Sequence, residues 1–468
     1  MISTKASSDD ITFPYTVNDD IELIRWFKEN YPKIDFITYK PSIDNYARSE
    51  KLQADIDAIK EKPLHEQKKE LLEIWKNLLG NAIVYLKSKD SREKFHDDED
   101  YGVDKLYDFF KSFSNFESLF YGANEYYRDH VSHMFKVFLL GEMLIREHIK
   151  FESIDIGEDI LKTKNTSKDI ISPNEKEAMW CIISLTHDLG YGIGVIPEIN
   201  KKTREMLHQF GNFNPRDLSY TFPNQPLYNY IIQFISSKIE KREENKFINH
   251  IQSKYYLKFS GSLEKTNHGI ISCIVLMRNL VYFLESDYTL DPNKPLDKED
   301  AKHFLIRRTI LKSIASHDCE DIYYLKVLDY PFLLTIFDEM QSWSRPKLSD
   351  LFEKTPEMIL TINHFDNKKI DFEIKLQYTT QLDPQQKKKE HKNALKYFVR
   401  KCEKIRRILR SAVDGKERDF TLQFTLIDEI ESSKRSYQIK HVKPNNVQYK
   451  INKEDSNWQK ILELLNSP

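Results

Sequence analysis

This sequence contains few glycines and has almost no net charge. Only 12 of its 468 residues are glycine, and 71 lysines and arginines nearly balance 73 aspartates and glutamates, leaving a formal charge of −2. A chain with so little net charge is not expected to bind nucleic acid in general or to adhere to a membrane surface. It also lacks the run of about 18 apolar residues that a membrane-spanning helix needs. The first residues, MISTKASSDDITFPYT, have neither the basic nor the apolar region of a signal peptide, so we expect none.

Cysteine is equally sparse. The four cysteines are far apart and form no CxxC pair: Cys181, Cys273, Cys319 and Cys402. Three of them lie in apolar helical patterns, which indicates reduced thiols in a protein core. Reduced thiols are typical of a cytoplasmic protein, and we expect a cytoplasmic location here.

The length is enough for two or three domains with a substantial core. Residues 1–100 are predicted to form a polar, helical N-terminal extension, because apolar residues recur at intervals of three and four. Residues 101–348 show long helical patterns and predict an all-helical bundle, without βαβ alternation. Residues 349–468 predict a smaller α+β domain, because two segments alternate like hairpin strands around a basic amphipathic helix. The predicted fold class is therefore mainly α.

Two helices of the central part have well-marked starts. In SPNEKEAMWCIISLTHDLG, Ser172 is the expected N-cap, Pro173 the first helical residue and Glu175 the capping-box partner. Asp297 is the expected cap of the helix that ends near SIASHD. Both helices lead directly to a His-Asp pair.

Histidines and aspartates occur in or beside apolar helical stripes throughout this central part. The face that carries His133 also carries Val137 and Leu140, so it is expected to be buried. Further such residues are His187 and Asp188 after one apolar run, His268, His317, and Asp338 after another. Each histidine alone is most simply a hydrogen-bonded core residue. Burying several imidazoles and two carboxylates together is costly unless they pair or bind a cation, and this donor set, without thiolate, suits Mn, Mg, Fe, Co, Ni or Zn.

Four ordered segments between about residues 125 and 346 resemble the HD superfamily of metal-dependent phosphohydrolases. RDHVSHMFKV is similar to the helix with the first histidine of that family, and HDLG to its signature. NHGIIS resembles the EHExxS segment of deoxynucleotide triphosphohydrolases. DEMQSWSR resembles their closing helix, and is still more similar to the DELDEWGR form of bacterial HD proteins. The resemblance implies an HD-type helical bundle in which His133, His187, Asp188 and Asp338 hold a divalent metal ion.

The sequence also departs from the triphosphohydrolase pattern. Tyr191 stands where a second histidine usually follows the signature, Asn267 and Gly269 replace two glutamates, and an Asp-Tyr pair becomes Gln341-Ser342. With His268 and His317 as ligands of a second ion, the order of histidines and aspartates resembles the two-metal HD phosphodiesterases instead. The sequence therefore leaves both one and two divalent ions per chain as alternatives.

Roles follow from the resemblance and from the chemistry of such ions. Asp188 is expected to hold the ion and orient the attacking water, with His268 as general acid or second-metal ligand and His317 beside it. His130 lies on nearly the same face as His133 and is the alternative ligand, although the pattern favours His133. Asp318 is interpreted as a helix-end residue.

Basic residues provide two further expectations. Arg128 and Arg345 are expected to bind substrate phosphate, with surface salt bridges as the alternative. The basic helix carries Lys392 and a candidate effector-binding stripe: Lys396, Arg400, Lys404 and Arg407. A solvated helix face is the simpler interpretation of this stripe, and a nucleotide effector or a partner subunit is the other.

Three functions remain open on the sequence. The first is a deoxynucleoside triphosphate triphosphohydrolase that releases deoxynucleoside and triphosphate. The second is a two-metal phosphodiesterase acting on cyclic nucleotides or dinucleotides. The third is a nucleotide-sensing HD module that acts through a partner protein. A homo-oligomer is expected from the resemblance, and nucleotide pool control and antiviral defence are both roles of such bacterial proteins.

Overall fold

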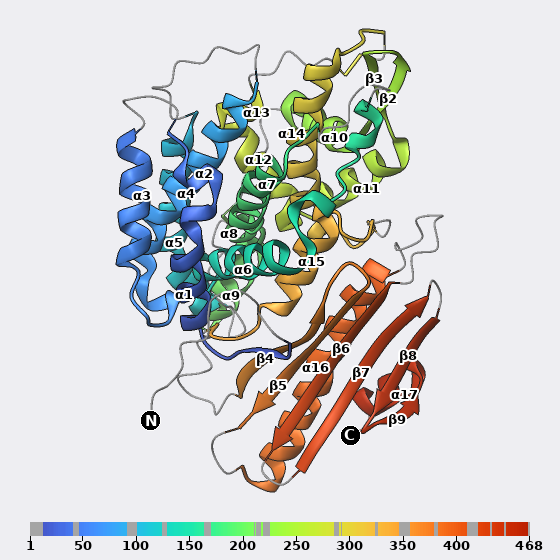
Figure 1. Cartoon of the computed structure of the whole chain (residues 1–468). Coiled ribbons are helices and arrows are strands. Elements are labelled where there is room, and N and C mark those ends of the chain that lie inside the picture. The colour runs from blue at the N-terminus through green and yellow to red at the C-terminus, as the bar shows by residue number, and fades with distance from the viewer. Residues whose placement is uncertain are drawn as a thin grey trace, which may run out of the picture.

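The computed structural model places a helical body beside a mixed β-sheet (Figure 1). The predicted fold class is confirmed: the chain is mainly helical, with an α+β part at the C-terminal end. The structure describes residues 13–40, 46–90, 101–123, 129–162, 170–209, 211, 217–218, 225–284, 290–291, 293–322, 326–345, 356–378, 382–409, 420–430, 433–443 and 446–466.

Helix α7 (Pro173–Thr186) lies at the centre of the helical body. All its residues from Glu175 to Thr186 are buried, and a helix apolar on every side must be covered on every side. It begins with the predicted capping box: Ser172 accepts a hydrogen bond from the backbone N–H of Glu175, whose carboxylate accepts one from the N–H of Ser172. Because α7 is enclosed, the residues that directly follow it are enclosed too.

Three long helices surround α7 and pack against it: α4 (Lys68–Ser88), α6 (Val131–Leu144) and α14 (Lys298–His317). In two of these contacts, the indole N–H of a buried tryptophan donates a hydrogen bond to the backbone of the neighbouring helix. Trp75 on α4 donates to the carbonyl of Leu185 at 2.7 Å, and Trp180 on α7 donates to the carbonyl of Phe138 at 3.2 Å. The end of α7 is thereby held in place just before the predicted His-Asp pair.

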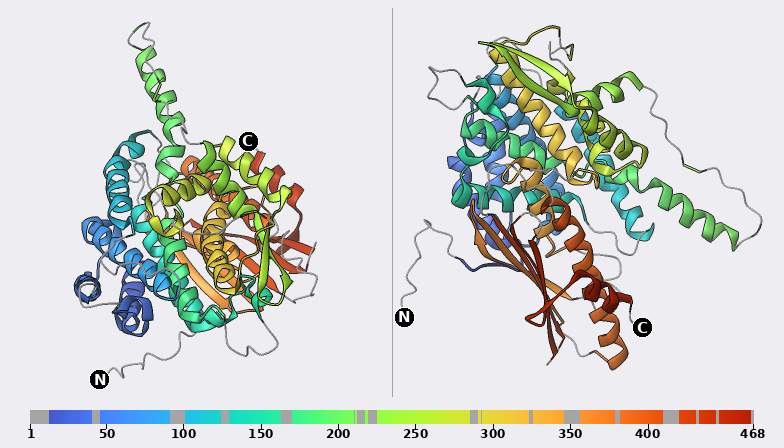
Figure 2. Two further views of the ribbon diagram at one scale, coloured as in Figure 1. Left: turned by 90° about the horizontal axis from the view of Figure 1, so that it is seen from above. Right: turned by 90° about the vertical axis from the view of Figure 1, so that its right-hand side faces the viewer.

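The remaining helices of the body complete the cover around this core. They are α1 (Ile21–Asn30), α2 (Asp35–Thr38), α3 (Tyr46–Ala58), α5 (Val103–Ala123), α8 (Tyr191–Gly194), α9 (Ile196–His208), α10 (Gln225–Ser236), α11 (Ser253–Glu264), α12 (His268–Asn279), α13 (Val281–Leu284) and α15 (Tyr330–Met340). Asp297 caps α14 as predicted, accepting from two backbone N–H groups. Helix α9 projects from the body (Figure 2), and none of its residues is buried.

The sheet has seven strands in the order β1-β4-β5-β6-β7-β8-β9. The strands are β1 (Tyr15–Val17), β4 (Glu357–Phe365), β5 (Lys369–Gln377), β6 (Thr421–Ile430), β7 (Ser433–Lys443), β8 (Asn446–Ile451) and β9 (Glu454–Ser456). All neighbours are antiparallel except β5 and β6, which are parallel and joined through α16 (Pro384–Leu409). Helix α16 packs on β6 and β7, and the C-terminal α17 (Trp458–Asn466) packs on α16.

Three strand features differ from the sequence-based expectation. The middle of the chain is not all helical, because β2 (Ser237–Glu243) and β3 (Lys246–Ile251) form a hairpin whose alternation was hidden among charged residues. The β5–α16–β6 connection is a βαβ crossover, which the hairpin-like strand patterns did not indicate. Strand β1 pairs with β4 although they are more than 300 residues apart, and no local pattern predicts such a pairing.

The predicted boundaries near residues 100 and 348 remain predictions, and elements on either side of both are in contact. The N-terminal segment supplies β1 to the sheet and α4 to the helical body. The buried carboxylate of Asp20 accepts from Trp343 at 3.0 Å and lies 3.3 Å from the ammonium of Lys136. The parts of the chain are therefore packed together rather than held by linkers alone.

One described segment, Pro173–His208, is long and apolar enough to cross a membrane by length and composition. In this fold 72% of its apolar window is buried inside the protein. Helix α7 supplies most of that burial, whereas α9 at the other end of the segment has no buried residue.

Candidate metal centre

Five helices bring the six predicted histidines and aspartates to one place inside the helical body. They are His133 in the first turn of α6, His187 and Asp188 directly after α7, His268 at the start of α12, His317 at the end of α14, and Asp338 near the end of α15. Side chains at helix ends can approach a common point without the helix backbones crowding it. The convergence that the sequence alone could not show is therefore present.

The two carboxylate oxygens of Asp188 each face a different pair of histidines. Oδ2 lies 3.6 Å from Nε2 of His133 and 3.5 Å from Nε2 of His187. Oδ1 lies 3.2 Å from Nε2 of His268 and 3.5 Å from Nε2 of His317. Asp188 consequently stands between two clusters of donor atoms, each compact enough to surround an ion.

Asp338 extends the first cluster. Its Oδ1 lies 3.0 Å from Nε2 of His133, and its Oδ2 lies 3.8 Å from the ammonium of Lys404 on α16. The second oxygen thus faces a cation contributed by the C-terminal part of the chain. We call His133, His187, Asp188 and Asp338 the first half of the centre, and His268, His317 and the shared Asp188 the second half.

Backbone carbonyls determine the tautomer of one histidine in each half. The Nδ1 of His187 lies 2.8 Å from the carbonyl oxygen of Ser184, and the Nδ1 of His317 lies 2.6 Å from that of Ile314. A carbonyl oxygen only accepts, so in both rings Nδ1 carries the proton and donates. The lone pair of Nε2 therefore points toward Asp188.

Side chains perform the same task for the other two histidines. Gln341 donates through its Nε2 to the carbonyl of Trp343, so its Oε1 faces His133 and accepts from Nδ1 at 2.5 Å. The Nδ1 of His268 donates to Oδ2 of Asp318 at 2.9 Å. Oriented in this way, all four imidazoles can present Nε2 toward the centre.

This arrangement fits a divalent cation in the first half. Nε2 of His187 is buried and has no hydrogen-bond partner among the described residues. Nε2 of His133 faces an oxygen of Asp338, which is also an acceptor. Buried acceptors that face one another without a donor are unfavourable, and a cation between them removes that cost. Imidazole nitrogens and carboxylate oxygens are ligands for Mn, Fe, Co, Ni or Zn.

The two halves differ in the protonation that their surroundings favour. Burial lowers the pKa of His187 to about 4, and burial together with the nearby Arg345 lowers the pKa of His133. Burial alone would also lower the pKa of His268, but the carboxylates of Asp318 and Asp188 outweigh it and raise this pKa to about 10. The imidazoles of the first half are therefore neutral beside two ionised carboxylates, whereas His268 is protonated and would have to lose that proton before an ion could bind.

Ser272 links the His-Asp turn to α12. Its hydroxyl accepts from the backbone N–H of Gly190 at 2.8 Å and lies 2.7 Å from the carbonyl oxygen of His187, to which it donates. A Cβ on Gly190 would come within 2.4 Å of the carbonyl oxygen of His268, so only glycine permits this approach. The HDLG and NHGIIS motifs are therefore two sides of one contact.

Gly269 explains one departure from the triphosphohydrolase pattern. A Cβ at this position would lie 2.6 Å from the carbonyl oxygen of Ile314 and 3.2 Å from the ring of His317. A glutamate would thus force α12 away from α14. Glycine here brings His268 close to His317, with 3.0 Å between their Nε2 atoms.

His133 rather than His130 faces the first half. His130 stands at the start of α6 and stacks on Tyr191, with 3.9 Å between ring centroids. Burial lowers the pKa of His130 to about 3. Tyr191 also lies 5.5 Å from the ring of His268, so it covers the second half of the centre instead of replacing a ligand.

Of the two predicted phosphate-binding arginines, the structure describes only Arg345. Arg128 lies outside the described residues. Arg345 lies near the first half, where its charge helps to lower the pKa of His133 and of His130. Its Nε is buried and has no hydrogen-bond partner in the described part of the chain.

The predicted effector stripe remains a prediction. Lys396, Arg400 and Lys404 are exposed, whereas Lys392, about 120° around the helix from Lys404, is half-buried. Lys404 also pairs with Glu339 beside the metal centre, with 2.5 Å between its Nζ and Oε1. The side chain of Arg407 lies outside the described part.

Sequence reasoning missed the orienting roles of Gln341 and Asp318. Gln341 was noted only as a departure from the family pattern, and Asp318 only as a helix-end residue. A third group, formed by Asp90, Glu299 and His303, was also not predicted, and it lies apart from the centre. Nothing local distinguishes such residues, because their partners come from other helices.

Comparison with protein-family models, with curated proteins and with solved structures finds no match to this chain.

Proposed function

We propose that the chain is a two-metal phosphohydrolase of the HD type that cleaves phosphodiester bonds of cyclic nucleotides or dinucleotides. The observation that carries this proposal is the position of Asp188, with one oxygen facing each pair of histidines. A carboxylate between two sets of Nε2 atoms could hold a cation on each side. The resemblance of the ordered motifs to HD phosphohydrolases supports the same chemistry.

Two divalent ions held by these histidines and aspartates would supply a hydroxide nucleophile near neutral pH and neutralise charge on the phosphoryl oxygens. The residues of the chain prepare the site for this chemistry. Gln341, Ser184, Ile314 and Asp318 each accept from the Nδ1 of one imidazole, which orients its Nε2 toward the centre. Nε2 of His268 would ligate after losing its proton. Asp188 joins the two halves and fixes the distance between them.

Arg345 is the residue best suited to bind the substrate phosphate. Its guanidinium lies close enough to the first half to affect His133, and its buried Nε has unused hydrogen-bonding capacity. Arginine binds non-bridging phosphate oxygens through paired N–H donors. Lys404 places a second cation beside Asp338, although its ion pair with Glu339 partly neutralises that charge.

Triphosphohydrolysis of deoxynucleotides is the second candidate, and the Asp318–His268 pair favours it. With a single ion in the first half, His268 would stay protonated near neutral pH because its pKa is raised to about 10. A protonated imidazole oriented by a carboxylate can donate to the leaving oxygen. The number of bound ions therefore separates the two candidates.

The deciding experiment combines metal counting with a substrate panel. Full-length protein is stripped with a chelator, reloaded with Mn²⁺, analysed for ions per chain and incubated with cyclic nucleotides, cyclic dinucleotides and deoxynucleoside triphosphates. We expect two ions per chain and cleavage of a phosphodiester. One ion with release of triphosphate would establish the second candidate instead. Loaded protein that cleaves none of these compounds would refute the enzymatic proposal.

A matched control uses the third His and carboxylate group. His303→Gln alters a buried histidine 3.2 Å from Glu299, outside the metal centre. It should keep both ions and full activity. A similar loss of ions in this variant would indicate that the measured metal binds elsewhere.

A further inference from the structure

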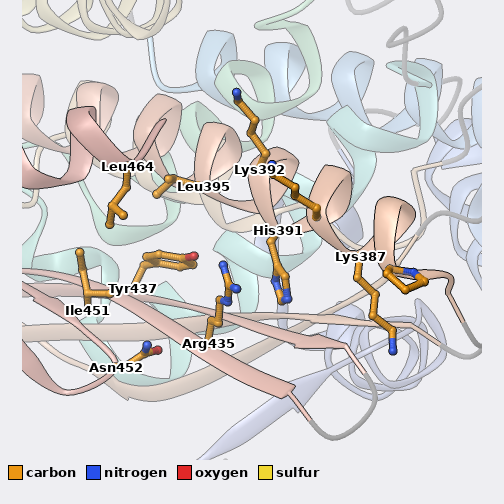
Figure 3. A pocket seen from close by; sticks show the side chains of 11 residues that line it. Lys387, His391, Lys392, Leu395, Arg435, Tyr437, Ile451, Asn452 and Leu464 are labelled. Atoms are coloured by element: carbon orange, nitrogen blue, oxygen red, sulfur yellow. The ribbon is translucent and has the colours of Figure 1, made fainter. Parts of the chain in front are cut away.

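A cavity of about 690 Å³ lies in the C-terminal α+β part, and it shares no residue with the metal centre. Its walls come from α16, from β7, from the end of β8 with the turn after it, and from α17 (Figure 3). This volume is within the range of sites that hold small organic molecules. The elements that form it are all anchored in the sheet or on α16.

Positive charge dominates one side of the cavity. Lys387, Lys388 and Lys392 contribute from α16, and Arg435 contributes from β7. No aspartate or glutamate is among the described residues that line it. Arg435 stands opposite Asp428 on the neighbouring strand, and this carboxylate is shared with His391. The four cations outnumber it, and an anion between them would relieve their remaining repulsion.

The position of the lysines strengthens this preference for an anion. Helix α16 starts at Pro384, so Lys387 and Lys388 lie at the end of its first turn, where the helix dipole is still positive, and Lys392 lies one turn further along. The first turn contains no acidic residue to offset them. His391 adds a ring on the same wall, and the buried carboxylate of Asp428, 2.5 Å from its Nδ1, holds that ring in place.

The opposite side of the cavity is apolar and aromatic. It consists of Leu395, Ile451, Leu464 and the ring of Tyr437. Leu464 is 41% exposed, which is unusual for leucine and leaves apolar surface facing the opening. A ligand that fits both sides carries a negative group at one end and a flat, weakly polar group at the other.

We infer that this cavity binds a nucleoside polyphosphate, with the phosphates against Lys388 and Arg435 and the base against Leu464 and Ile451. Lysine and arginine bind phosphate through charge-assisted hydrogen bonds, and an apolar wall with a tyrosine accommodates a base. The inference does not depend on the proposed hydrolytic function, because the site is built without any residue of the metal centre.

The test measures nucleotide binding with the metal centre disabled. Full-length Asp188→Ala protein is titrated by calorimetry in the presence of a chelator, with ATP, GTP, CTP, UTP and inorganic tripolyphosphate as ligands. We expect saturable binding of at least one nucleotide below about 1 mM and weaker binding of tripolyphosphate. Tripolyphosphate that binds as tightly as every nucleotide would overturn recognition of a base. No saturable binding of any nucleotide would overturn the site.

Two charge-reversed variants of similar design locate the binding. Lys388→Glu with Arg435→Glu changes two lining residues and should weaken binding at least about tenfold. Lys396→Glu with Arg400→Glu changes two exposed residues of α16 outside the cavity and should weaken it less than about twofold. Equal losses in both variants would show unspecific attraction and refute the site. Thermal unfolding of each variant verifies that the fold is retained.

A third variant tests the apolar side. Leu464→Asp should weaken nucleotide binding while leaving tripolyphosphate binding unchanged or weaker only through its added charge. Because Leu464 is substantially exposed, this change is expected to preserve the fold. Unaltered nucleotide affinity would place the base elsewhere and overturn the proposed orientation.

Discussion

The two halves of the metal centre share Asp188 but offer different environments to a cation. In the first half, His133 and His187 are fully buried, their pKa values are lowered, and Asp338 supplies a second carboxylate. In the second half, the side chain of His268 is 22% exposed, and Asp318 and Asp188 raise its pKa to about 10. The first half therefore needs no proton to leave before an ion binds, whereas the second half does.

If two ions bind as proposed, this difference predicts that their affinities are unequal. One difference is the ligand set, because Asp338 gives the first half a carboxylate that the second half lacks. The other is the partner of each Nδ1, which is a backbone carbonyl or an amide for three of the rings and a carboxylate for His268. A carboxylate partner raises the basicity of the ring and makes protons compete with the ion.

Removing the shared carboxylate should have the largest effect, because it breaks both halves together. Asp188→Ala is expected to lose both ions and to reduce hydrolysis at least about a thousandfold. Elemental analysis and the substrate panel measure these two quantities. A variant that retained one tightly bound ion would show that the halves do not share Asp188.

Removing a ligand from the second half alone should affect the ion of that half and leave the ion of the first half in place. His268→Ala is expected to leave one ion per chain and to lower phosphodiester hydrolysis about a hundredfold. His187→Ala is the matched variant in the first half, and it should instead lose the tighter ion. If both variants keep two ions, or both lose two, the assignment of separate halves is wrong.

Acidity should affect the second half more strongly than the first. Below a pKa of about 10, an ion at the second half must displace one proton from His268, so its affinity should rise about tenfold per pH unit between about pH 7 and pH 9. His187 is already neutral in this range because its pKa is about 4, so the affinity of the first half should stay nearly constant. Titration of stripped protein with Mn²⁺ at several pH values measures both.

Asp318→Asn is the control for this pH dependence. Without the carboxylate, His268 loses the main source of its raised pKa, and the affinity of the second ion should vary less with pH. An unchanged slope in this variant would attribute the proton to another group.

The smallest predicted effect concerns the residue that orients His133. Gln341→Ala removes the acceptor for Nδ1 and should weaken the first ion about tenfold without removing a ligand. Ser342→Ala is the matched control, because Ser342 bonds to Tyr397 and not to a histidine. Equal affinities in the two variants would mean that Gln341 does not orient the ring.

Some parts of this architecture could be predicted because their signals are local. The capping box at Ser172, the Asp297 cap and the strands β4 to β7 follow from patterns within a few residues. The pairing of β1 with β4 and the hairpin of β2 and β3 could not be predicted in the same way. The first depends on residues far apart in the chain, and the second contains several charged residues that obscure its alternation.

The site shows the same division. Helical periodicity placed His133, His268 and His317 on apolar faces, and the ends of two apolar runs marked His187, Asp188 and Asp338. Their order along the chain suggested an HD-type centre. Periodicity did not distinguish His130 from His133, because residues three apart lie on nearly the same face. The structure places one against Tyr191 and the other against Asp338.

The sequence by itself determined where helices begin, which faces are apolar, and which side chains are available as ligands. Only the tertiary structure decided that Asp188 stands between two histidine pairs, that Gln341 and Asp318 orient them, and that lysines of α16 and an arginine of β7 line one cavity. The physical reason is range: propensity, capping and periodicity act over a few residues. A binding site depends on atoms within about 4 Å of one another in space, wherever they lie in the chain.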